Sequence, residues 1–184
     1  MAINNADIAN NNANIASNDI DIALNAANIS KNAADIKDIV CPTSESGYII
    51  VNNKCIYLES SAMTHANAKL NCLAKMECYG FGRLFEPKSK SMNDLVATET
   101  NTVFASYWVW IGFNDIATDM TYVFDSDNSP VLSAFSPKWH NSYGPGGNKD
   151  SADCGILSLF KLGSLAIGDW AESACAATRR SICE

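Results

Sequence analysis

The sequence of 184 residues lacks the features that would assign it to several common functional classes. It has no apolar run near the roughly 20 residues that a membrane-spanning helix needs. Its 13 Lys and Arg against 20 Asp and Glu give a net charge of −7. Because phosphates and anionic lipids are bound by cationic surfaces, neither nucleic acid nor membrane insertion is expected. With two His and no C-x-x-C pair, a structural zinc site is not expected either.

Motifs of catalysis are equally scarce. The sequence contains no phosphate-binding glycine loop and no Cys and His nucleophile arrangement. Ser158 and Lys161 match the S-x-x-K pattern, but they fall on an expected strand without the companion motifs. We therefore expect a protein that is not an enzyme and that needs no cofactor.

The first forty residues contain no glycine, proline, cysteine or aromatic residue. They consist largely of 10 Asn, 10 Ala and 8 Ile, and they carry a net charge of −3. All seven cysteines lie from residue 41 onward. This change in composition predicts two domains, residues 1–40 and residues 41–184.

The first domain has a seven-residue repeat in which an isoleucine is followed three positions later by an asparagine. The series is Ile8, Asn11, Ile15, Asn18, Ile22, Asn25, Ile29, Asn32 and Ile36. This spacing is that of the a and d positions of an α-helical coiled coil. Asn is a poor helix former, so association between copies would have to supply the stability. The pattern predicts a homo-oligomeric stalk, and we favour a trimer over a dimer because layers of three asparagines can close a hydrogen-bonded ring. The alternative is a low-complexity polar linker.

The second domain combines its cysteines with a series of short motifs. They are Cys41-Pro42, Cys55-Ile56-Tyr57, Cys72, Trp110-Ile111-Gly112, Asp153-Cys154, Trp170 five residues before Cys175, and Ile182-Cys183-Glu184. In this order and spacing, residues 41–184 resemble a C-type lectin-like domain of the long form, which begins with an additional hairpin.

The resemblance implies an α+β fold with two helices, small antiparallel sheets, a long loop and three disulfides. The implied bridges are Cys41 to Cys55, Cys72 to Cys183, and Cys154 to Cys175. Cys78 is left over, and both a free thiol and an intermolecular or additional bridge remain open for it. Paired cysteines are typical of an oxidising compartment, so we expect a secreted, extracellular protein.

Periodicity and turn residues agree with this fold. Apolar residues at helical spacing predict a helix over 61–77, and a second, short helix is expected over 93–100. Apolar runs predict strands over 48–51, 107–113, 122–124, 155–159 and 180–183, while turn residues fill the segment between 124 and 154. Trp110, Ile111 and Trp170 are expected in the core.

Calcium-dependent members of the family that this domain resembles bind sugar through a calcium ion, and most of the ligands for that ion are missing here. The Glu-Pro-Asn type of triplet is replaced by Gly144-Pro145-Gly146, and Ala152 stands where a loop glutamate is expected. The Trp-Asn-Asp triplet reads Trp170-Ala171-Glu172. We therefore expect the usual calcium site to be absent. A rearranged cation site, formed by Asp150, Asp153, Asp169 and Glu172, stays open as an alternative.

A loop rich in aromatic and amide side chains adjoins the flexible Gly-Pro-Gly-Gly segment, and such a loop suits contact with a sugar or a protein. Trp139 in this loop is expected in the core. The predicted ligand-binding residues are His140, Asn141, Tyr143, Asn148, Asp150, Asp169 and Glu172. The sequence thus predicts a multivalent recognition or adhesion protein for a glycan or an extracellular protein, acting without the usual calcium site. The alternative is a structural building block of an extracellular fibre, coat or matrix.

Overall fold

A computed structural model describes residues 4–76, 82–104, 107–131, 138–139 and 152–184. Contacts within the chain divide it into two units, Met1–Ile39 and Val40–Glu184. We refer to the second unit as the head. Among the described residues, no helix combines the length and the apolar character that crossing a membrane requires.

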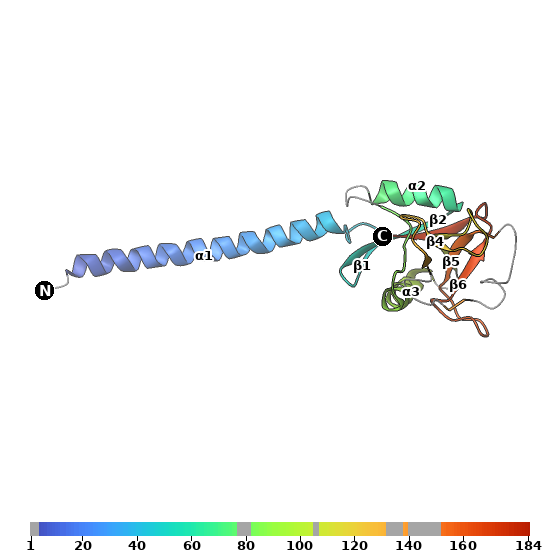
Figure 1. Cartoon of the computed structure of the whole chain (residues 1–184). Coiled ribbons are helices and arrows are strands. Elements are labelled where there is room, and N and C mark those ends of the chain that lie inside the picture. Colours follow the sequence, from blue (N-terminus) through green and yellow to red (C-terminus); the bar gives the residue numbers. More distant parts are fainter. Residues whose placement is uncertain (1–3, 77–81, 105–106, 132–137, 140–151) are drawn as a thin grey trace. The chain divides into compact units, whose positions relative to one another are not determined.

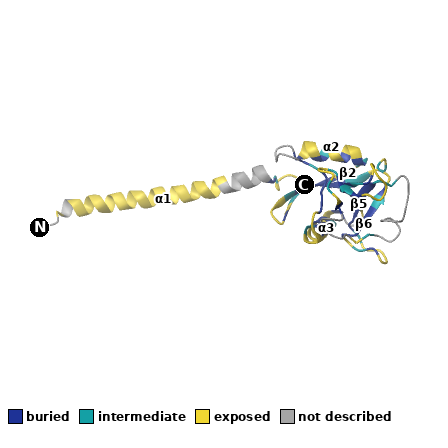
Figure 2. Cartoon of the chain, in the orientation of Figure 1, coloured by how far each residue is buried: buried dark blue, intermediate teal, exposed yellow. Residues whose placement is uncertain are grey.

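The first unit is built on one long helix, α1 (Asn5–Val40; Figure 1). Freedom from glycine and proline, together with frequent alanine, allows the helix to run without interruption. The isoleucines of the repeat that are described, Ile8, Ile15, Ile22 and Ile29, are 47 to 69% exposed in the single chain (Figure 2). The helix is therefore present, and its assembly into a coiled coil stays a prediction.

The head contains one seven-stranded sheet in the order β1-β2-β7-β3-β5-β6, with β4 paired to β3 outside this path. The strands are β1 (Tyr48–Val51), β2 (Lys54–Met63), β3 (Trp108–Asn114), β4 (Val123–Phe124), β5 (Cys154–Ser158), β6 (Trp170–Ser173) and β7 (Arg179–Cys183). Strands β3 and β7 run parallel, and the other pairs are antiparallel. Five of these strands, β1, β3, β4, β5 and β7, lie near the segments predicted from apolar runs, whereas β2 and β6 were not predicted from such runs.

Two helices flank the sheet, and both differ in length from their predictions. Helix α2 (His65–Lys75) begins after Thr64, whose hydroxyl accepts a hydrogen bond from the backbone N–H of Asn67. The predicted helix start at residue 61 is wrong because β2 continues to Met63, which pairs with Arg179 of β7. Helix α3 (Lys90–Phe104) is longer at both ends than the predicted 93–100.

The core lies on both faces of the sheet, and successive residues of β3 alternate between its two apolar clusters. Trp110 belongs to the cluster that includes Cys72 of α2, whereas Ile111 belongs to the cluster that includes Val96 of α3. Trp110, Ile111 and Trp170 are fully buried, which confirms their prediction as core residues. The indole N–H groups of Trp110 and Trp170 donate to Met63 O and to Asn93 Oδ1, at 2.8 and 2.7 Å.

Three disulfides cross-link the head: Cys41–Cys55, Cys72–Cys183 and Cys154–Cys175. They are the pairs that the resemblance implies. Cys72–Cys183 joins α2 to the last strand across 111 residues of sequence. Cys78 lies outside the described residues.

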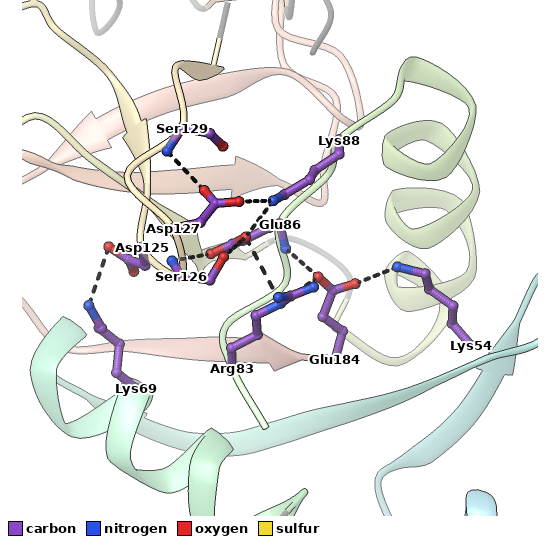
Figure 3. A network of polar contacts seen from close by, with 10 residues as sticks. All are labelled: Lys54, Lys69, Arg83, Glu86, Lys88, Asp125, Ser126, Asp127, Ser129 and Glu184. Atoms are coloured by element: carbon purple, nitrogen blue, oxygen red, sulfur yellow. Dashed lines mark hydrogen bonds and ion pairs between the residues drawn. The ribbon is translucent and has the colours of Figure 1, made fainter. Parts of the chain in front are cut away.

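A network of hydrogen bonds and ion pairs holds the last residue, Glu184, to other segments of the head (Figure 3). The carboxylate of Glu184 accepts from Arg83 Nε at 3.1 Å and from Lys54 Nζ at 3.0 Å. Glu86 is 2% exposed, and its two carboxylate oxygens accept from the backbone N–H and the hydroxyl of Ser126. Burial raises the pKa of Glu86, while the Ser126 bonds favour its ionised form. These carboxylates have protein partners, so we assign them a structural role.

Candidate functional site

Most of the predicted ligand-binding residues belong to the loop between β4 and β5. His140, Asn141, Tyr143, Asn148 and Asp150 lie outside the described residues. Trp139 before this segment and Ala152 after it are described, so the site is built here from the residues that border the loop.

Aromatic rings anchor the start of the loop. Trp139 is partly buried, with its ring centroid 4.7 Å from that of Tyr122 and 5.6 Å from that of Phe113. Phe113 in turn stacks on Trp170 at 4.7 Å. The backbone O of Lys138 accepts from the N–H of Trp170 at 2.9 Å. These contacts agree with the prediction that Trp139 is a core residue, and they fix the point where the loop leaves the core.

Four carboxylates form an acidic cluster beside this anchor: Asp115 and Asp119 after β3, Asp153 before β5, and Glu172 within β6. Asp115 follows the last residue of β3, and its N–H donates to the backbone O of Asp153 at 3.1 Å. Asp115 Oδ2 accepts from the N–H of Met120 at 2.8 Å, which closes the turn that carries Asp119. Glu172 lies on β6 opposite Gly155 of β5. Asp153 directly precedes Cys154, the first residue of β5.

The charges of the acidic cluster oppose one another. Burial, together with the charges of Asp115, Asp119 and Asp153, raises the pKa of Glu172 to about 7, although a hydrogen bond from Tyr122 favours its ionised form. Burial also raises the pKa of Asp115, and the charges of Asp153 and Asp119 add to this effect. Asp115 Oδ1 and Glu172 Oε1 are buried and have no hydrogen-bond partner among the described residues. Glu172 is therefore only partly ionised near neutral pH.

The family that the sequence resembles implies calcium, and we tested the described residues against that ion. Calcium needs six to eight oxygens, several of them from carboxylates. Within the described ranges, no three or more His, Cys, Asp or Glu side chains are grouped so that they could hold a metal ion. Ala152 and Ala171 offer no side-chain oxygen where the family's ligands are expected. The carboxylates interact through their charges, but the described part of the site does not fit calcium.

Asp169, another predicted ligand-binding residue, lies in different surroundings from Glu172. It is 3% exposed, and its Oδ2 accepts from Lys138 Nζ at 3.0 Å and from the N–H of Ala166 at 2.8 Å. These bonds hold the turn before β6 against the residue that precedes Trp139. Of the predicted cation site, the structure brings together Asp153 and Glu172 and gives Asp169 other partners.

Asp115, Asp119 and Tyr122 are not among the site residues predicted from the sequence. Asp115 directly follows Asn114, at the end of the apolar run that contains Trp110-Ile111-Gly112, so its position after a buried strand was a usable signal. That Tyr122 would meet Glu172, fifty residues later, depends on strand pairing and has no local signal.

The head is similar to known proteins in sequence and in fold. The model of the Lectin C-type domain matches residues 61–184. Among solved structures, the mouse scavenger receptor C-type lectin carbohydrate-recognition domain is 21% identical with a TM-score of 0.56, over 75% of this chain and 92% of that one. A calcium-independent type II antifreeze protein is 23% identical with a TM-score of 0.56, over 76% and 91% of the two chains. Human lithostathine is 19% identical with a TM-score of 0.60, over 76% and 96%. No curated protein sequence matches this chain. At these identities the shared feature is the fold.

Proposed function

Because the chain belongs to the C-type lectin domain family, we propose that it is a secreted, non-catalytic recognition protein. In this proposal α1 clusters several heads, and each head binds a carbohydrate or a protein without the usual calcium site of the family. The observation that carries the proposal is the row of exposed isoleucines on α1, spaced by seven residues, because association of copies would remove these side chains from water.

The composition of the candidate site supports recognition without calcium. Ala152 and Ala171 remove two side-chain ligands, and the raised pKa of Glu172, about 7, leaves that carboxyl only partly ionised near neutral pH. One structure of similar fold is described as a calcium-independent antifreeze protein, so this fold can be maintained without the ion. Contact with the ligand would then come from His140, Asn141, Tyr143, Asn148 and Asp150 of the loop, beside Glu172.

Three disulfides support secretion, because such bridges form and persist in oxidising compartments. Clustering supplies what a weak single site lacks. When several heads on one stalk contact a repetitive surface, the later binding events become intramolecular, and the apparent affinity can rise by about 10² to 10⁴.

A glycan array tests this proposal. We expect the full chain to bind a subset of densely printed glycans equally with calcium and with EDTA, and the Ile22→Asp variant to lose most of that signal because it cannot cluster. Loss of binding in EDTA would contradict the calcium-independent site. Growth of the free protein into long polymers, without binding to any glycan or protein surface, would favour the structural building block instead.

A further inference from the structure

Of the ten lysines and arginines of the head that the structure describes, six form ion pairs with carboxylates, and two of the other four, Arg179 and Arg180, are neighbours in the sequence. The six, four of them within the network of Figure 3, are Lys54, Lys69, Arg83, Lys88, Lys90 and Lys138. Arg179 and Arg180, at the start of β7, form no ion pair with any carboxylate in the described part of the chain. In a protein with a net charge of −7, two adjacent cations without a counterion call for an explanation.

Both arginines line one surface cavity of about 410 Å³. Its other lining residues include Ser60, Tyr107, Trp108 and Thr178. Trp108 begins β3, and Val109 after it pairs with Arg180 of β7. The acidic cluster follows the other end of β3, so the two sites are about 20 Å apart along that strand, at the usual rise per residue.

The guanidinium of Arg180 is held in place for contact with a ligand. It lies over the ring of Tyr107, 3.9 Å from the centroid, and 5.1 Å from the ring centroid of Phe104. Its Nε donates to the backbone O of Ser60 at 3.1 Å. Among the described residues its two terminal nitrogens bond to no protein atom, and they are the pair that binds a carboxylate or sulfate most directly.

Arg179 adds a second, partly buried cation to the same cavity. Its Nη2 and Nε donate to Ser173 Oγ at 2.8 and 3.2 Å, and its guanidinium lies 5.6 Å from the ring centroid of Trp110. Burial lowers the pKa of Arg179, since the charged form loses hydration without gaining a carboxylate. An anion in the cavity would compensate that loss.

We propose that this cavity binds the carboxylate or sulfate group of an acidic saccharide. The terminal nitrogens of Arg180 would hold the anionic group, and Arg179 would add a second positive charge to the wall of the cavity. The exposed part of Tyr107 and the partly buried Trp108 would contact the sugar ring, because aromatic side chains provide an apolar surface beside polar groups. The inference rests on the proposed function only in taking the ligand to be a saccharide, and it adds a binding site separate from the long loop.

Binding of small acidic sugars to the full chain tests the site. Saturation-transfer difference NMR, titrated to saturation at low salt, would compare glucuronic acid and glucose 6-sulfate with glucose. We expect the two acidic sugars to bind at least about tenfold more tightly than glucose, and to weaken as salt is added. Equal binding of all three sugars would overturn the proposal. So would inorganic sulfate that binds as tightly as glucose 6-sulfate, measured by its displacement of that sugar and the loss of the sugar's saturation-transfer signal.

Variants locate the binding in the cavity. Arg180→Ala should lose the preference for acidic sugars. Arg180→Lys keeps the charge but not the planar fork, so it should retain only part of the preference. Lys31→Ala, which removes one positive charge from α1, is the charge-matched control and should bind like the wild type. Since a fold defect in Arg180→Ala would mislead, its circular dichroism and thermal midpoint are compared with those of Arg180→Lys. A folded Arg180→Ala with undiminished preference would overturn the proposal.

The two proposals fail separately. Monosaccharides report on single heads, so a monomeric protein that binds glucuronic acid through Arg180 would refute clustering and leave this inference standing. An oligomer that binds glycans but ignores acidic monosaccharides would refute only the acidic saccharide site.

Discussion

At the scale of single residues, the carboxylates of the head fall into two groups, which differ in their hydrogen-bond partners. Glu86 and Glu184 are buried with donors on their carboxylate oxygens, and they join segments of the fold. Glu172 lies among other acids, and one of its oxygens has no hydrogen-bond partner within the described ranges. A carboxylate in such surroundings costs stability when it ionises, which natural sequences tolerate where the group has a use. The acidic cluster therefore makes the stability of the head depend on pH.

The raised pKa of Glu172 predicts a loss of stability with rising pH. Its ordinary value is 4.5 and its folded value is about 7, so between these the native state binds more protons than the unfolded state. The free energy of unfolding should therefore fall as pH rises from about 4.5 to about 8, by about 1 to 2 kcal/mol because solvent screens this partly exposed group, and then level off. Glu172→Gln, which cannot ionise, should match the wild type near pH 4.5 and exceed it at pH 8 in urea unfolding.

The difference in unfolding free energy between Glu172→Gln and the wild type at each pH separates the contribution of Glu172 from that of other titrating groups. Burial lowers the pKa of His65, which acts in the opposite direction because the unfolded state then binds the extra proton as pH falls. The difference between Glu172→Gln and the wild type cancels that contribution. Glu45→Gln, at an exposed glutamate, is the matched control and should follow the wild type at every pH. A constant difference between pH 4.5 and 8 for Glu172→Gln would contradict the assigned pKa.

At the scale of elements, α1 and α2 show what periodicity does and does not predict. The heptad pattern predicts a helix over the first domain, and α1 covers it because nothing in that segment competes with the helix. The pattern over 61–77 predicts α2 only in part, because pairing of β2 with β7 claims residues as far as Met63. On α1, Ile20 and Leu24 are also exposed, although they lie away from the heptad positions.

Two substitutions to aspartate on α1 test whether the heptad positions form the interface between copies. Ile22 is an a position, whereas Ile20 lies two residues earlier, about 200° around the helix. Each is more than 60% exposed in the single chain. If the a positions form the interface, Ile22→Asp should reduce the oligomer to a chain of 19.8 kDa while Ile20→Asp keeps the wild-type mass, as measured by sedimentation equilibrium at micromolar concentration. A monomeric wild type, or equal effects of the two variants on the mass, would contradict the prediction that the heptad positions form the interface.

At the scale of the whole molecule, the head is closed by joining its beginning to its end. Strand β2 pairs with β7, so that Leu58 lies opposite Ile182, and Cys72 is bonded to Cys183. Such contacts bring together parts of the chain more than a hundred residues apart, and they confine the segments between them. The stability of the head should therefore depend strongly on the bridge that closes the longest loop.

Removal of single bridges measures that dependence. Replacing both Cys72 and Cys183 with alanine should lower the free energy of unfolding by about 4 to 5 kcal/mol, because their loop spans 111 residues. The matched control replaces Cys41 and Cys55, whose separation is 14 residues, and should cost about 3 kcal/mol. Denaturant unfolding of both double variants decides the order. A larger loss for the short loop would contradict the chain-entropy argument.

The sequence by itself determined the features that are written in local spacing. They include the change in composition after residue 40, the helix of the first domain, and, through the resemblance, the cysteine pairs and the alanines at residues 152 and 171. Only the tertiary structure decided that Asp115 and Asp153 meet Glu172, and that Arg180 stacks on Tyr107 beside Ser60. Each of these sites joins residues far apart in the chain. Strand order and register set such distances, and a shift of one residue would turn each side chain to the other face of the sheet.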